Sequence, residues 1–273
     1  MIKTYAVIGD PIDHSLSPAI HNAAFAFLGL DCTYIAYRIP KDDLVLGIDS
    51  LKLINIAGFN VTIPHKVEMM KILDYADEDC KMIGATNTID NENGKFKGYN
   101  TDMDGFLEPI KRRNLTCKDS DVLLVGAGGA ARAIVAAFAK EKAHKITIAN
   151  RTKEKAEDLI KFANKLGLES EYTDLSNAGN TAGNYKFIVN ATSVGMKGNS
   201  SPISTRTIKK DCIVYDIVYM PVETELLEQS KKQGATIIYG WEMLLAQAMR
   251  SFEIWTKRKA PYEAMKLTLL GRF

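Results

Sequence analysis

Residues 121–152 read DVLLVGAGGAARAIVAAFAKEKAHKITIANRT and have the pattern of a strand, a glycine-rich turn, a helix and a second strand. The apolar run Val122 to Val125, which ends at a turn, is typical of a buried parallel strand. Gly126, Gly128 and Ala131 then fill the three positions of the G-x-G-x-x-G/A fingerprint. Such a turn lets backbone N–H groups approach a pyrophosphate at the positive end of the helix. The stretch predicts a dinucleotide-binding unit, although a turn that only packs a helix close to a sheet shares the pattern.

The end of the second strand indicates which dinucleotide is bound. An acidic residue there usually binds the ribose of NAD, whereas a cation accommodates the 2′-phosphate of NADP. Here Asn150-Arg151-Thr152 follows the strand, and the first acid is Glu154. The planar guanidinium of Arg151 can bind a phosphate through two hydrogen bonds, and Lys155 adds a further charge. We therefore expect NADP, the alternative being a basic helix start that only faces solvent.

Composition describes a soluble globular protein of about two domains, with 273 residues, 46% of them hydrophobic and 25% charged. The net charge of +2 comes without long blocks of one sign, so we expect no nucleic-acid and no membrane partner. The four cysteines form no C-x-x-C pair, which disfavours a disulfide framework and a metal site. The N-terminus lacks the features of a signal peptide, and a cytoplasmic location is expected.

The order of patterns predicts an α/β chain with two domains. The first domain is expected to span residues 1–104 and to be completed by helices within 241–273, and the Rossmann-type domain to span 105–240. The first domain is expected to have strands at 3–9, 33–39 and 58–63, helices at 18–28, 42–54 and 65–75, and a hairpin that turns at Asn93-Gly94. Ser17 is expected to cap the first helix. The second domain is expected to have strands at 122–125, 145–149, 187–190, 213–217 and 236–239, helices at 131–142 and 153–166, and a loop at 175–183. Helices at 104–114, 241–257 and 262–270 complete the prediction.

Lys66 and Asp102 are the best candidates for proton transfer, which the oxidation of an alcohol by a nicotinamide requires. Each lies just after a predicted strand or strand-like segment, where open α/β sheets bind ligands, so we expect an ion pair between them. The alternative is a solvated lysine and a helix-capping aspartate. The four histidines, at 14, 21, 65 and 144, all have ordinary structural interpretations.

Nine short stretches between residue 5 and residue 250 then identify a resemblance. They are HSLSP (14–18), NVTIPHK (60–66), GATNT (84–88), GYNTD (98–102), GAGGA (126–130), NRT (150–152), NATSVGM (190–196), YDIVY (215–219) and GWEMLLAQ (240–247). Together, and in this order, they resemble the shikimate dehydrogenase family. Any one of them is a weak signal, whereas nine in register are specific.

The resemblance implies the reversible, NADP-dependent reduction of 3-dehydroshikimate to shikimate, a step toward aromatic amino acids, with both ligands in a cleft between the domains. It implies that Lys66 and Asp102 are the catalytic pair, with the Lys66 ammonium protonating the developing alkoxide and Asp102 orienting it. The positions that match substrate contacts are Ser15, Ser17, Asn60, Thr62, Asn87, Tyr219 and Gln247. The positions that match the cofactor side are Gly126, Ala127, Gly128, Gly129, Ala130, Asn150, Arg151, Thr152, Lys155, Ile217, Gly240 and, near the cofactor, Glu78. Short polar side chains suit a substrate with three ring hydroxyls.

Some alternatives stay open at this point. Lys155 stands where many relatives have arginine, which would weaken a bidentate phosphate contact. A quinate/shikimate dehydrogenase of broader substrate or cofactor use, a folate-type dehydrogenase and a non-catalytic NADP-binding relative are the rival functions. A monomer and a homodimer are both compatible with the sequence.

Overall fold

The computed structural model describes residues 2–198 and 200–273 and divides into two compact units. The first unit consists of the chain up to Asp104 together with Leu245–Arg272. The second unit is Gly105–Leu244, with which the last residue is grouped. Helices α4 (Asp102–Arg112) and α9 (Gly240–Thr256) each begin in one unit and end in the other. The two-unit α/β fold expected from the sequence is confirmed.

The first unit has a mixed sheet, in which the described strands follow the order β2-β1-β3-β5-β6-β4. Strand β1 pairs in parallel with β2 and β3, and β5 pairs antiparallel with β3 and β6. The β5–β6 hairpin turns at Asn93-Gly94, which have positive φ angles of 56° and 84°, as a type I′ turn requires. The strands are β1 (Lys3–Gly9), β2 (Cys32–Arg38), β3 (Gly58–Val61), β4 (Tyr75–Ala76), β5 (Thr88–Glu92) and β6 (Lys95–Tyr99).

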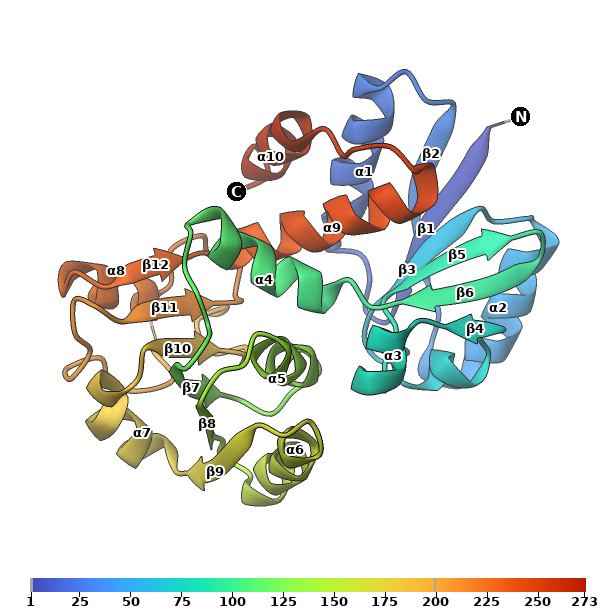
Figure 1. Ribbon diagram of the computed structural model, residues 1–273. Helices are drawn as coiled ribbons and strands as arrows, with labels where there is room; N and C mark the ends of the chain where they lie inside the picture. The colour runs from blue at the N-terminus through green and yellow to red at the C-terminus, as the bar shows by residue number, and fades with distance from the viewer. Residues whose placement is uncertain (1, 199) are drawn as a thin grey trace. The chain divides into compact units, whose positions relative to one another are not determined.

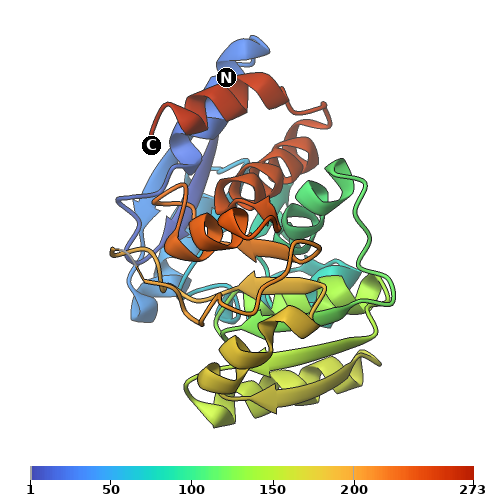
Figure 2. The same cartoon turned by 90° about the vertical axis from the view of Figure 1, so that its left-hand side faces the viewer.

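Helices cover the sheet of the first unit, and an N-terminal helix contacts a C-terminal one. The apolar side of α2 packs with Phe59, Ile89 and Phe96 of the strands. Helix α10 contacts α1, and both ribbon views show the two helices side by side (Figures 1 and 2). The C-terminal helices therefore return to the first unit, as the sequence predicts. The helices are α1 (Ser17–Phe27), α2 (Leu44–Leu53), α3 (Glu78–Ile83), most of α9, and α10 (Tyr262–Leu270).

The second unit has a parallel sheet, whose described strands follow the order β12-β11-β10-β7-β8-β9. The chain enters at β7 and builds β8 and β9 on one side, then returns to add β10, β11 and β12 on the other. The carboxyl ends of β7 and β10 thus flank the point where the winding reverses, which is where such sheets bind ligands. The strands are β7 (Asp121–Val125), β8 (Lys145–Ala149), β9 (Glu169–Thr173), β10 (Phe187–Asn190), β11 (Ile213–Asp216) and β12 (Thr236–Ile238).

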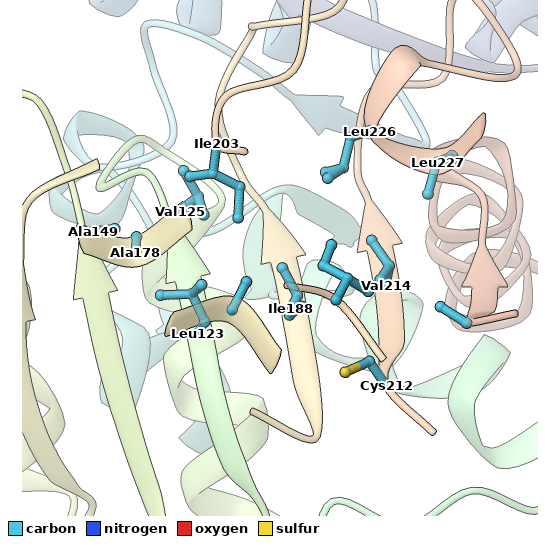
Figure 3. Close-up of a cluster of buried hydrophobic side chains, with 13 residues drawn as sticks. Leu123, Val125, Ala149, Ala178, Ile188, Ile203, Cys212, Val214, Leu226 and Leu227 are labelled. Carbon is cyan, nitrogen blue, oxygen red and sulfur yellow. The ribbon is translucent and has the colours of Figure 1, made fainter. Parts of the chain in front are cut away.

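Both faces of this parallel sheet are covered by helices, which explains why its central strands read as continuous apolar runs. Helices α5 (Ala131–Lys140) and α6 (Lys153–Lys165) contact each other, and Phe138 of α5 packs on Phe187 of β10 with ring centroids 5.5 Å apart. On the other face, strand side chains meet α7 (Leu175–Thr181) and α8 (Glu225–Lys232). Figure 3 shows this cluster, with Leu123, Val125, Ile188 and Val214 from the strands and Ala178, Leu226 and Leu227 from the helices.

Two local predictions for the first unit are wrong. Residues 65–75 form only a short 3-10 helix, Glu68–Lys71, because Asp74 exchanges hydrogen bonds with the backbone of Phe96 and draws the chain toward the sheet edge as β4. Ser17 does not cap α1. It is the first residue of that helix, and its N–H donates to Ser15 Oγ at 3.4 Å.

The second unit also differs from the prediction at residues 175–183, which were expected to form a loop. Helix α7 forms there because the Asp174 carboxylate accepts a hydrogen bond from Asn177 N at 2.9 Å, and because Ala178 and Gly179 are buried. Strand β9 and helix α8 were not predicted. Strand β9 lies at the sheet edge and is mostly polar, and α8 follows a threonine cap at Thr224.

Candidate functional site

The centre of the candidate site is an ion pair between Lys66 and Asp102. Lys66 follows β3, and Asp102 is the first residue of α4. Lys66 Nζ lies 2.5 Å from Asp102 Oδ2, and the two side chains are 23% and 11% exposed. The expected ion pair is therefore present, and Lys66 is not a solvated surface lysine. Partial burial makes such a charged hydrogen bond stronger than an exposed pair.

The second oxygen of Asp102 has a different partner. Asn87 Nδ2 donates to Asp102 Oδ1 at 2.8 Å, and the backbone N–H of Asp102 donates to Asn100 Oδ1 at 3.1 Å. A backbone hydrogen bond also holds the loop that carries Lys66: the N–H of Thr86 donates to the Lys66 carbonyl at 2.9 Å. The carboxylate thus has a fixed orientation toward the lysine.

A buried hydrogen-bonded cluster lies next to this pair. Asn60 Oδ1 accepts from the Tyr34 hydroxyl at 2.7 Å, and Asn60 Nδ2 donates to the Asn87 carbonyl and to Thr88 Oγ1, both at 3.0 Å. Ser251 joins from α9, where its Oγ lies 2.8 Å from Thr88 Oγ1. Thr101 completes the cluster through hydrogen bonds with Asn87. The cluster connects segments from across the first unit and fixes the side chains around Asn87.

Sequence reasoning missed several members of this cluster. Thr88 and Thr101 belong to the motifs at 84–88 and 98–102, so their positions in those motifs were a usable signal. Tyr34 and Ser251 lie within ordinary strand and helix patterns and carry no such signal.

The remaining candidate substrate residues of the first unit lie in the same compact unit as the Lys66–Asp102 pair. Ser17 hydrogen-bonds with the Tyr34 hydroxyl, whose pKa burial raises well above its ordinary value despite that bond. The methyl group of Thr62 occupies the space beside Gly9, where an added Cβ would lie 2.4 Å from it. The carbonyl of Gln247 accepts a hydrogen bond from Ser251 Oγ at 3.0 Å. Ser15, Ser17, Asn60, Thr62, Asn87 and Gln247 therefore belong to the same unit as Lys66 and Asp102, whereas Tyr219 belongs to the second unit.

His21 is buried behind this cluster and is not placed for proton transfer. Its ring stacks on Tyr34 with centroids 4.4 Å apart, and neither ring nitrogen has a hydrogen-bond partner among the described residues. Burial lowers its pKa to about 3, so the ring is neutral near pH 7.

The glycine-rich turn of the second unit has the shape of a phosphate cradle. Gly126 has a φ of 108°, and an added Cβ would lie 2.7 Å from Thr192 Cγ2, so this position requires glycine. Around Gly129, in contrast, an added Cβ would meet open space. Helix α5 begins directly after Ala130, and N–H groups in the first turn of a helix have no acceptor within the helix. A pyrophosphate needs open space and N–H donors at the start of a helix, and the turn offers both, so these residues fit that group.

The turn after β8 fits the adenosine 2′-phosphate of NADP. Asn150 Nδ2 donates to the Thr152 carbonyl at 2.7 Å and so shapes the turn. Arg151, Thr152 and Lys155 are exposed. The neighbouring Lys153 is engaged differently, because its amine lies 5.7 Å from the Tyr172 ring centroid and 3.7 Å from Glu157. All three cations of this turn, Arg151, Lys153 and Lys155, are thus exposed, and Lys153 also contacts Tyr172 and Glu157.

Two further cofactor candidates, Ile217 and Gly240, pack together in the second unit, and a third, Glu78, belongs to the first unit. An added Cβ at Gly240 would lie 2.3 Å from the Val218 carbonyl oxygen and 2.6 Å from the Ile217 carbonyl carbon. Glycine at 240 thus lets the loop that carries Ile217 cross the start of α9. Glu78 lies in α3 of the first unit, where it is 86% exposed and pairs with Lys81 at 2.7 Å.

Comparison with known proteins identifies the family. Family models match the chain as a shikimate dehydrogenase substrate binding domain over residues 7–89, as shikimate / quinate 5-dehydrogenase over 109–216, and as a shikimate 5′-dehydrogenase C-terminal domain over 240–270. A shikimate dehydrogenase (NADP(+)) of Nitrosopumilus maritimus is 62% identical over 273 residues, which cover 100% of both chains. The chain belongs to the shikimate dehydrogenase family.

Solved structures of this family agree with the fold. A crystal structure of a shikimate dehydrogenase in complex with NADP⁺ matches this family member with a TM-score of 0.93 and 40% identity, covering 99% of this chain and 96% of that one. A quinate dehydrogenase from Corynebacterium glutamicum in complex with NAD also matches, with a TM-score of 0.93, 28% identity and 99% of each chain covered.

The described residues contain neither a candidate metal site nor a helix that could span a membrane. Among residues 2–198 and 200–273, no group of three or more His, Cys, Asp or Glu side chains is arranged to hold a metal ion. Within the same ranges, no helix has the length and apolar character that crossing a membrane would require.

Proposed function

We propose that this protein catalyses the reversible NADP-dependent reduction of 3-dehydroshikimate to shikimate, in the biosynthesis of aromatic amino acids. The observation that carries the proposal is the Lys66–Asp102 ion pair, with Asn87 holding the second carboxylate oxygen. The names and ligands of the 62% identical relative and of the NADP⁺ complex support the choice of substrate and cofactor.

Lys66 is proposed as the general acid of the reduction and the general base of the reverse reaction. Its ammonium group, already hydrogen-bonded to Asp102 Oδ2, would give a proton to the substrate oxygen that becomes a hydroxyl. NADPH, when bound, supplies the hydride. Asp102 keeps the ammonium in place and, because Asn87 and Asn100 hold its carboxylate and backbone, does so without reorganising.

The substrate contacts are proposed to be Ser15, Ser17, Asn60, Thr62, Asn87, Tyr219 and Gln247. A substrate with one carboxylate and several hydroxyls needs many short polar groups, and a site that pairs each hydroxyl rejects analogues that lack one. The buried hydrogen bonds of Asn60 and Asn87 support this assignment, since they hold both amides in single orientations.

The cofactor side is proposed to be the second unit, with residues 105–240 as the NADP-binding domain and 1–104 plus 241–273 as the substrate-binding domain. The turn at Gly126 to Ala130 would hold the pyrophosphate, and Asn150, Arg151, Thr152 and Lys155 the 2′-phosphate. Ile217 and Gly240 are proposed to lie on the cofactor side, and Glu78 near the cofactor. We propose a cytoplasmic location, which the free thiols of the cysteines support. Because one chain supplies every candidate residue, a monomer or a homodimer would serve.

The similarity to an NAD-bound quinate dehydrogenase supports a second candidate, a quinate/shikimate dehydrogenase of broader cofactor use. The four pairs of shikimate or quinate with NADP⁺ or NAD⁺ separate the two, with nicotinamide absorbance as the readout. We expect rapid turnover with shikimate and NADP⁺ alone. Turnover of quinate or use of NAD⁺ at a similar rate would favour the second candidate, and a folded protein that binds NADPH without any turnover would be a non-catalytic relative.

A further inference from the structure

Asp216, at the end of β11, is a buried carboxylate that the proposed reaction does not use. Its exposed fraction is 0%, and three donors surround it. Asp216 Oδ1 accepts from Asn190 Nδ2 at 2.9 Å and from Val218 N at 3.0 Å, whereas Oδ2 accepts from Thr224 Oγ1 at 2.7 Å. The two oxygens thus hold different parts of the second unit.

Oδ1 holds two segments that carry proposed ligand contacts. One is the turn after β10, where Asn190 Oδ1 accepts from both the N–H and the hydroxyl of Thr192, and Thr192 packs on Gly126. The other is the loop that leads to Tyr219. Among the described residues, Val218 is the only one of this loop whose backbone N–H donates to the Asp216 carboxylate. One oxygen therefore links the phosphate turn to the tyrosine loop.

We propose that Asp216 is a positioning residue that, through Oδ1, holds the Tyr219 loop in the arrangement that binds substrate and keeps the Thr192 turn against the phosphate turn. The proposal rests on the proposed function, because it takes Tyr219 as a substrate contact. Asp216 itself touches no ligand in this scheme.

Oδ2 provides a matched control within the same carboxylate. Its partner Thr224 caps α8, and the Thr224 hydroxyl accepts from Leu227 N at 3.4 Å. Thr224→Val removes a buried hydrogen bond of Asp216 but leaves both Oδ1 bonds in place. A purely structural role of Asp216 would make this variant resemble Asp216→Ala.

Asp216→Asn provides the rescue. Its amide oxygen can take the place of Oδ1 and accept from Asn190 and Val218, while its NH₂ group takes the place of Oδ2 and donates to the Thr224 hydroxyl. The variant thus keeps the Oδ1 bonds without the charge, whereas Asp216→Ala removes the acceptor of all three donors.

The test compares the full-length wild type with Asp216→Ala, Asp216→Asn and Thr224→Val. We measure kcat, KM for shikimate with saturating NADP⁺, and hydrogen exchange of the Val218 and Tyr219 amides. Asp216→Ala should raise KM roughly tenfold with a smaller change in kcat, and should speed exchange of both amides, because a hydrogen bond to a charged group is lost. Asp216→Asn and Thr224→Val should keep KM within about threefold of the wild type and should leave the exchange slow.

Equal KM and exchange in Asp216→Ala and Thr224→Val would overturn the proposal. If Asp216→Ala does not fold, Asn190→Ala provides a second test. It keeps the Asp216 carboxylate but removes the side chain that connects it to the Thr192 turn. That variant should weaken NADP⁺ binding several-fold and speed exchange of the Thr192 amide, and unchanged values would overturn the linkage. A wild type without shikimate turnover would overturn the proposed function alone, because amide exchange still decides the role of Asp216.

Discussion

At the scale of single residues, the carboxylate of Asp102 has separate partners for its two oxygens, Lys66 Nζ and Asn87 Nδ2. This division fixes the carboxylate, and therefore the ammonium, in one geometry. A fixed charged pair stabilises a transition state more than a mobile one, because no reorganisation is needed during the reaction.

Asp102→Asn is expected to lower kcat by roughly 10²-fold or more, because the ammonium loses its charged partner and its orientation. Steady-state kinetics with shikimate and NADP⁺ measure this effect. Glu68→Gln is the matched control, since Glu68 forms an exposed pair with Lys71 at 2.7 Å. It should leave kcat unchanged, and an Asp102 variant as active as this control would remove Asp102 from the catalytic pair.

Arg151→Ala is expected to weaken NADP⁺ binding by roughly 1.5–3 kcal/mol, the usual value of hydrogen bonds to charged groups, and to leave NAD⁺ binding nearly unchanged. Binding titrations with both dinucleotides measure the difference. Lys153→Ala is the control, because the Lys153 amine lies over Tyr172 and near Glu157. Equal losses for NADP⁺ and NAD⁺ would contradict the assignment of the 2′-phosphate site.

At the scale of secondary-structure elements, the parts that follow from the sequence are those whose local pattern and packing agree. The β7–α5–β8 unit was predictable, because a central parallel strand is apolar on both faces and its turn requires glycine at 126. Helix α7 was not, because asparagine and glycine favour loops locally while the Asp174 cap and burial of Ala178 favour the helix.

The candidate site shows the same limit. Their positions after predicted strands singled out Lys66 and Asp102, the resemblance implied their catalytic role, and their ion pair is present. The supporting contacts of Asn60 involve Tyr34 and Ser251, and Ser251 lies 191 residues away along the chain. Local patterns carry no information on such a pairing, which depends on how α9 packs in the first unit.

The packing of α1 on β2 buries His21. We therefore expect the free energy of unfolding to depend on pH through this residue. Its pKa falls from 6.5 to about 3 on folding, so the unfolded state binds a proton that the native state does not. This contribution is complete above pH 6.5 and is lost as pH falls toward 3, by about 1.4 kcal/mol per pH unit between these values.

Urea unfolding of the wild type and of His21→Phe, between pH 7 and pH 4, isolates this effect. Phenylalanine can keep the stack on Tyr34 but cannot bind a proton. The stability of the wild type relative to His21→Phe should therefore fall as pH is lowered. A difference that stays constant with pH would mean that the imidazole is not buried in its neutral form.

At the scale of the whole molecule, two units with their own sheets carry the two halves of the proposed function, and helices α4 and α9 connect them along the chain. A ligand that binds only the native second unit stabilises it by mass action. NADP⁺ at 100 times its Kd should therefore add about 2.7 kcal/mol to the stability of this unit.

Thermal unfolding with NADP⁺ or NAD⁺ at equal concentration tests this expectation. NADP⁺ should raise Tm more than NAD⁺ does, and hydrogen exchange should slow first at the turn of Gly126 to Ala130. Equal shifts with the two dinucleotides would contradict the preference assigned to Arg151, and protection confined to the first unit would contradict the assigned cofactor domain.

The central claim is that Lys66 transfers the proton in NADP-dependent oxidation of shikimate, and kcat of Lys66→Ala with both ligands at saturation tests it most directly. We expect a loss of roughly 10²–10⁴-fold relative to an active wild type, the usual size of general acid–base catalysis, with a smaller change in KM. A variant that keeps the wild-type kcat and differs only in KM would contradict the account, because Lys66 would then bind the substrate without taking part in its chemistry.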